Sequence, residues 1–218
     1  MVDIRPEFTG ISRSALLPLN SRAVFGDPFA HILYGHISDT TVTKNTEKIK
    51  NAPLIKRMLY IDFLTLEFMK LNPRAKILNL GCGFCTRFHR LDNGLIVWTD
   101  VDEVSLFGDV KKEVLPNNDR YNFVQKNISS DLSDMLGYDL VIAEGVLMYI
   151  DKGEIISLLN NLRCQIIVEL ANNNRPDKPD AFKWHYDLSR DEFLSNRLVE
   201  EVCYDRNLQK YILLLDPI

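Results

Sequence analysis

The feature that most constrains this chain is a short apolar run that ends in two glycines. Ile77 to Leu80 reads as a buried strand, Gly81 and Gly83 follow at once, and a helix is expected over 86–91. Glycine is needed where a backbone turns sharply and lets a ligand approach without a Cβ atom in the way. About 20 residues further on stand Asp100 and Asp102, and a carboxylate there can accept hydrogen bonds from both ribose hydroxyls of an adenosine. The pattern therefore predicts an adenosine site.

Two other interpretations of this turn stay open. A dinucleotide-binding fingerprint has a third glycine, and Thr86 stands in its place, which disfavours NAD as the ligand and an NAD-dependent oxidoreductase as the function. A turn with a purely structural role is the other alternative. Cys82 and Cys85 form a Cys-x-x-Cys pair, but a zinc site needs two further ligands and the other cysteines are isolated, so we expect no metal site.

The wider pattern predicts an α/β chain with a Rossmann-like, mostly parallel seven-stranded sheet that an antiparallel hairpin closes. Residues 1–72 read as a helical segment, in which a long helix runs from Pro53 to Leu71, and residues 73–218 read as the core of one domain. After Pro73 short apolar runs alternate with helical segments, which is typical of parallel strands joined by crossover helices. The expected strands are 76–80, 95–99, 121–125, 138–143, 165–170, 199–204 and 210–215, and the expected helices of the core are 86–91, 103–113, 130–136 and 152–162.

Composition excludes several classes of protein. The chain has 218 residues, of which 46% are hydrophobic, so it can bury a core. Its net charge of −4 argues against binding nucleic acid through bulk positive charge, and RNA methylation is disfavoured on the same ground. No apolar run approaches the ~20 residues that cross a bilayer, and the N-terminus lacks the apolar region of a secretory signal. We therefore expect a cytoplasmic protein that does not act at a membrane.

Several blocks taken together resemble the leucine carboxyl methyltransferase-like family, which includes the carboxyl methyltransferases of protein phosphatase 2A and O-methyltransferases of polyketide tailoring. This family has the class I fold of S-adenosylmethionine-dependent methyltransferases. The blocks span about 140 residues in the family's order. They are Ser12–Ala23, Asp27–Pro28, Arg57 with Tyr60–Asp62, Leu80–Phe88, Trp98–Asp102, Asn127–Leu132 and Ala143–Ile150.

The resemblance implies S-adenosylmethionine as cofactor, S-adenosylhomocysteine as product, and a role for each matching residue. Gly81, Cys82 and Gly83 would line the cofactor, and Asp102 would hold its ribose. Asp131 and Leu132 would flank the adenine, Glu144 would lie beside the methionine portion, Arg57 would pair with the methionine carboxylate, and Arg22 would assist from the N-terminal segment. We expect that segment, residues 1–72, to pack on the core and cover this site.

The chain departs from the family's pattern in three ways. Cys85 stands where the family usually has Asp, and Glu103 and Val104 follow Asp102 where the family more often has a short apolar residue and Pro. The chain is also shorter than many members after the fifth strand. These departures affect the expected identity of the acceptor more than the expected identity of the cofactor.

The acceptor is expected to be a carboxylate or hydroxyl of a small, polyketide-like molecule, or a carboxyl group of a protein. A carboxylate acceptor needs no general base, whereas a hydroxyl usually does. The candidate bases are His185, in a segment that follows the fifth strand, and Tyr149, each of which could instead have only a packing or surface role. The alternative function is a non-catalytic nucleotide-binding or regulatory protein of the same fold.

Overall fold

The computed structural model describes residues 7–38, 52–129, 135–171, 182–183, 186, 197–205 and 210–217. Asp131, Leu132 and His185 lie outside these ranges, as does most of the helix expected over 130–136. The expectations for these three residues therefore stay predictions. Among the residues that the structure describes, no helix is long and apolar enough to cross a membrane.

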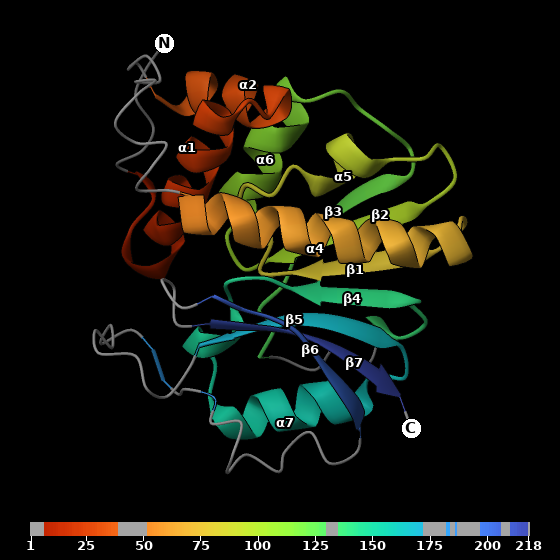
Figure 1. The fold of residues 1–218 in the computed structure, drawn as a ribbon. Helices are drawn as coiled ribbons and strands as arrows, with labels where there is room; N and C mark the ends of the chain where they lie inside the picture. Colours follow the sequence, from red (N-terminus) through yellow and green to blue (C-terminus); the bar gives the residue numbers. More distant parts are fainter. Residues whose placement is uncertain are drawn as a thin grey trace.

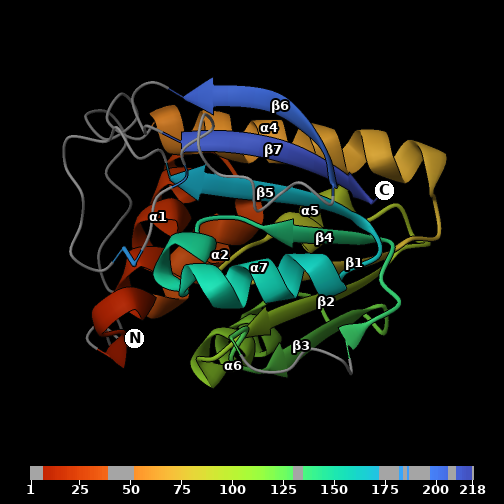
Figure 2. The ribbon, with the colours of Figure 1, turned by 90° about the horizontal axis from the view of Figure 1, so that it is seen from below.

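Seven strands form one sheet in the order β3-β2-β1-β4-β5-β7-β6 (Figure 2). Strands β1 (Lys76–Leu80), β2 (Val97–Asp102), β3 (Tyr121–Gln125), β4 (Leu140–Ala143) and β5 (Gln165–Ala171) pair in parallel. Strand β7 (Lys210–Pro217) runs antiparallel to both β5 and β6 (Arg197–Asp205), and so forms the hairpin that closes the sheet. The expected Rossmann-like sheet is confirmed.

The bounds expected for the second strand were wrong by two or three residues at each end. The sequence places it at 95–99, whereas β2 covers Val97–Asp102. Asp100 and Asp102, which the sequence places just after residue 99, belong to the strand itself. Asp100 can stay in the strand because Asn79, Trp98, Tyr121 and Lys111 all donate hydrogen bonds to its buried carboxylate.

The N-terminal segment is helical, as expected. It contains a 3₁₀ helix, η2 (Gly10–Ala15), followed by α1 (Leu16–Phe25), α2 (Pro28–Ile37) and α4 (Ala52–Leu71). Gly26, with φ of 115°, ends α1, and Asp27 then caps α2 by accepting hydrogen bonds from the amides of Phe29 and Ala30 at 3.0 and 3.1 Å. Asp27 therefore sets the direction of α2 relative to α1.

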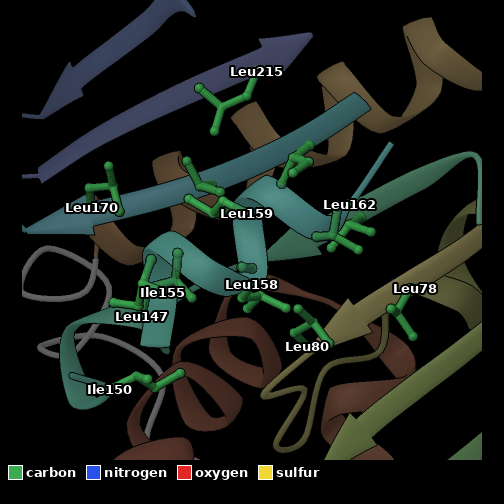
Figure 3. Packing of buried hydrophobic residues seen from close by; sticks show 14 of the residues in the cluster. Leu78, Leu80, Leu147, Ile150, Ile155, Leu158, Leu159, Leu162, Leu170 and Leu215 are labelled. Atoms are coloured by element: carbon green, nitrogen blue, oxygen red, sulfur yellow. The ribbon is translucent and has the colours of Figure 1, made fainter. Parts of the chain in front are cut away.

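Helices cover the two faces of the sheet (Figure 1). The crossover elements are α5 (Arg87–Leu91), α6 (Ser105–Val114), η4 (Leu147–Tyr149) and α7 (Lys152–Asn161). Leu78 and Leu80 of β1 pack in a cluster with Ile155 and Leu159 of α7, which Figure 3 shows, whereas Ile77 packs in a second cluster with residues of α4. Alternate residues of one strand thus fill two apolar layers, which explains the continuous apolar runs in the sequence.

A third apolar cluster joins the N-terminal segment to the core. Phe84, from the turn after β1, makes edge-to-face contacts with Phe8 and with Phe107 of α6. Leu19 of α1 and Leu33 of α2 belong to the same buried cluster. This packing holds η2, α1 and α2 against the turn that contains the two glycines.

Candidate functional site

A cavity of about 690 Å³ lies at the carboxyl ends of the parallel strands. The glycine turn follows β1, and Glu144 follows β4, so the cavity spans the point where the strand order reverses between β1 and β4. Ligands of open α/β sheets bind at such a point. Every described residue that the sequence assigned to the cofactor lines this cavity: Arg22, Arg57, Gly81, Cys82, Gly83, Asp102 and Glu144.

The glycine turn has the backbone conformation that its sequence predicts. Gly81 and Gly83 have φ values of 59° and 46°, which disfavour residues with a Cβ atom. A Cβ on Gly81 would also overlap the side chain of Val146. The amide of Cys82 donates to the carbonyl of Val101 at 3.1 Å, and the amide of Gly83 donates to Oδ2 of Asp102 at 2.9 Å. The turn is thereby attached to the end of β2.

The carboxylate of Asp102 is partly buried and accepts hydrogen bonds from two backbone amides. Besides the bond from Gly83, its Oδ1 accepts a hydrogen bond from the amide of Val104 at 3.2 Å. Burial raises the pKa of Asp102 above its ordinary value, because these two amides only partly offset the loss of hydration. A cavity-lining carboxylate of this kind still has acceptor capacity for a pair of hydroxyls.

Glu144 has two arginine partners, which the sequence did not reveal. Its Oε1 accepts from Nε of Arg57 at 2.8 Å, and its Oε2 accepts from Nη2 of Arg87 at 2.7 Å. Burial by itself would raise its pKa, but the two guanidinium groups outweigh burial and hold the pKa of Glu144 well below its usual range. Glu144 thus has protein partners for its charge and also lines the cavity.

Arg57 is also engaged with protein groups. Its Nη1 donates to both oxygens of Glu169 at 3.1 and 3.2 Å, in addition to the bond from Nε to Glu144. Only Nη2 then remains for a ligand. Glu169 in turn accepts from Nζ of Lys210, at the start of β7, at 2.9 Å.

Arg22 lines the cavity, and its guanidinium makes one hydrogen bond among the described residues. It is buried, and its Nη2 donates to the carbonyl of Phe84 at 2.6 Å. Its Nε has no hydrogen-bond partner among the described residues, and no carboxylate of those residues forms a salt bridge with it. Burial lowers the pKa of Arg22, because the carboxylates nearby only partly compensate the lost hydration. An unpaired buried donor is costly, so this group fits an anionic ligand.

The ion pairs continue away from the cavity toward α2. Arg87 donates to Asp62 at 2.7 Å, and Arg90 pairs with both Asp62 and Asp27. These residues and those of the cavity wall form one connected set of cations and carboxylates. The cations are Arg57, Arg87, Arg90 and Lys210, and the carboxylates are Asp27, Asp62, Glu144 and Glu169.

Cys85 lies within this charged network. Its sulfur is 3.5 Å from Nη1 of Arg87, so a thiol contacts the guanidinium. In the part of the chain that the structure describes, no group of three or more His, Cys, Asp or Glu residues could hold a metal ion.

The cavity also has apolar and aromatic lining residues. Leu17, Pro53 and Leu54 line it together with Tyr149 and Phe182, whose rings meet edge to face at 5.3 Å. Tyr149, a candidate base, thus lies in the cavity. A hydrogen bond of 2.9 Å from the amide of Lys183 to the carbonyl of Met148 holds this segment against η4.

Several residues of the site were not singled out in the sequence. Arg87 and Lys210 contact the carboxylates of the site, and Asn79 and Lys210 line the cavity. Glu169 could have been found, because a carboxylate inside the apolar run Ile166–Leu170 is costly to bury without a charged partner. Arg87 follows the glycine turn and gave no comparable signal.

Comparison with known proteins gives one similar curated sequence. The tetracenomycin polyketide synthesis O-methyltransferase TcmP of Streptomyces glaucescens is 26% identical over 160 residues, which cover 67% of this chain and 58% of TcmP. The chain thus spans less than two thirds of that relative. No protein-family model matches the sequence.

Solved structures of methyltransferases share the fold. Magnesium protoporphyrin IX methyltransferase of Synechocystis PCC 6803, solved with bound S-adenosylhomocysteine, matches 90% of this chain and 97% of its own, with a TM-score of 0.58 and 12% identity. The N-methyltransferase NodS of Bradyrhizobium japonicum WM9 matches 75% and 97%, with a TM-score of 0.55 and 13% identity. At such identities the likeness shows the fold, which is that of the class I methyltransferases.

Proposed function

We propose that this chain binds S-adenosylmethionine in the cavity and transfers its methyl group to an oxygen atom of an acceptor. The fold, the similar O-methyltransferase sequence and the residues of the cavity support this function. When bound, S-adenosylmethionine supplies a methyl group on a positively charged sulfur. The protein's own contribution is to bind the cofactor, align the acceptor and exclude water.

One observation supports the proposal above all others: the carboxylate of Asp102 and the guanidinium of Arg22, whose Nε has no partner among the described residues, line the same cavity as the glycine turn. Asp102 and Arg22 match the ribose hydroxyls and the methionine carboxylate in charge and hydrogen-bonding type. Arg57 can add its remaining nitrogen to the carboxylate.

The residues of the site also favour membership of the leucine carboxyl methyltransferase-like family. The ordered motifs bring Arg22, Arg57, Asp102 and Glu144 to one cavity, and the relative TcmP is itself an O-methyltransferase of polyketide synthesis. Asp131 and Leu132 are proposed, from the resemblance, to flank the adenine. The segment 1–72 is proposed to cover the bound cofactor.

The acceptor is proposed to be a carboxylate or hydroxyl of a small, polyketide-like molecule, or a protein carboxyl group. The described lining residues contain no histidine, and Arg57 and Arg87 make Glu144 a weak base. Those residues therefore suit an acceptor oxygen that is already ionised. His185 and Tyr149 remain the candidate bases for a hydroxyl acceptor.

Calorimetric titration with S-adenosylmethionine, S-adenosylhomocysteine and NAD tests the proposal. We expect the two sulfur nucleosides to bind and NAD not to bind, because Thr86 stands where the dinucleotide turn has its third glycine. Binding of NAD alone would support the oxidoreductase alternative. If the sulfur nucleosides bind but no methyl group reaches any acceptor in an extract of the source cells, the non-catalytic alternative gains support.

A further inference from the structure

Asp100 lies directly beneath the glycine turn and connects four elements. Its Oδ1 accepts hydrogen bonds from Asn79 of β1 and Trp98 of β2, both at 2.8 Å. Its Oδ2 accepts from Tyr121 of β3 at 2.8 Å and from Lys111 of α6 at 2.7 Å. Both members of the Asp100–Lys111 ion pair are 1% exposed, so both charges are shielded from solvent.

Lys111 contacts the turn as well as Asp100. Its Nζ lies 3.5 Å from the sulfur of Cys82, the residue between the two glycines. Burial disfavours the charged form of Lys111, but Asp100 more than compensates, so the pKa of Lys111 is raised well above its ordinary value. A charged side chain from α6 therefore joins the middle of the turn to the strand that ends in Asp102.

The position of Asp102 depends on this arrangement. Asp100 and Asp102 are two residues apart in β2, and the turn reaches Asp102 through the amide of Gly83 at 2.9 Å. A shift of Cys82 relative to Asp100 would change the place of that amide and hence the orientation of the Asp102 carboxylate. Buried, fully hydrogen-bonded ion pairs tolerate little displacement.

We propose that Lys111 is a positioning residue for the cofactor: acting through Asp100 and Cys82, it sets the glycine turn against the end of β2 and so orients Asp102 toward the ribose. This inference rests on the proposed binding of S-adenosylmethionine. Lys111 itself touches no reacting group, since it is buried beneath the turn.

A double-mutant cycle on S-adenosylhomocysteine affinity tests it, with Lys111→Met and Asp102→Ala made singly and together. If Lys111 acts through Asp102, Lys111→Met weakens binding at least about tenfold in the native background and less than about threefold in the Asp102→Ala background. Equal losses in both backgrounds, or no loss in the native one, would overturn the inference. A general loss of structure would give equal losses.

Two further variants keep the result interpretable. Lys112→Met removes the same charge from the exposed next residue of α6 and should leave the affinity unchanged. If Lys111→Met alone does not fold, the cycle is run with Asp100→Asn/Lys111→Met, which leaves no uncompensated buried charge.

If the unmodified protein fails to bind the nucleoside, the proposed function itself is wrong. If it binds and the cycle is additive, only the role of Lys111 is wrong.

Discussion

At the scale of single residues, Asp102 has the largest expected effect on cofactor binding. Asp102→Ala should weaken the binding of S-adenosylmethionine at least about tenfold, because it removes charge-assisted hydrogen bonds to the ribose that are together worth ~1.5–3 kcal/mol. Titration calorimetry measures the change, with Asp109→Ala on the exposed side of α6 as the control. Unchanged affinity would place the ribose elsewhere.

Arg22 should act on a different part of the cofactor. Arg22→Met is expected to weaken the binding of S-adenosylhomocysteine about tenfold, since it removes the guanidinium that we propose pairs with the methionine carboxylate and whose Nε has no partner among the described residues. Binding of 5′-methylthioadenosine, which lacks that carboxylate, should stay the same. Arg13→Met, an exposed arginine on η2, is the matched control. A parallel loss for both nucleosides would show that Arg22 only supports the cavity wall.

At the scale of elements, Glu144 connects α4 and α5 to the end of β4. Glu144→Gln leaves Arg57 and Arg87 without a shared counter-ion and should lower the free energy of unfolding by about 3 kcal/mol at neutral pH. Because the folded-state pKa of Glu144 is depressed, its contribution is complete above about pH 5 and is lost as the pH falls below about 4. Denaturant unfolding should therefore show the difference shrinking in acid. A constant difference would contradict the ion-pair role.

The packing of α6 on β3 gives a second prediction for elements. A Cβ on Gly108 would overlap the ring of Phe123, whereas a Cβ on Gly153 of α7 meets nothing within 4 Å. Gly108→Ala should lower the melting temperature, because overpacking costs about 1–3 kcal/mol. Gly153→Ala should raise it slightly, because alanine is the better helix former by about 0.5–1 kcal/mol. Equal shifts in the two thermal melts would show that α6 can move away from β3.

At the scale of the whole molecule, the N-terminal segment and the core share one cavity. Ser12, Ala15 and Leu17 of the N-terminal segment line it together with Gly83 and Asp102 of the core. Hydrogen exchange should therefore slow in both η2–α1 and the glycine turn when S-adenosylhomocysteine is added. Protection confined to the core would contradict the proposal that residues 1–72 cover the cofactor.

The sheet and the glycine turn could be predicted because their signals are local. A parallel strand that is buried on both faces needs a continuous apolar run, and β1, for example, has the predicted bounds. A backbone with positive φ next to a close side chain needs glycine, as at Gly81. Such constraints act within a few residues and are therefore visible in the order of amino acids.

Only the tertiary structure decided which charges meet. The sequence marked Glu144 and Arg57 but not their pairing with each other, nor the contact of Arg57 with Glu169, which is 112 residues away. It also gave no sign that the buried Nε of Arg22 has no hydrogen-bond partner among the described residues. Ion pairs between distant residues depend on how helices pack on a sheet. That packing brings together side chains that are far apart in the sequence and share no local motif.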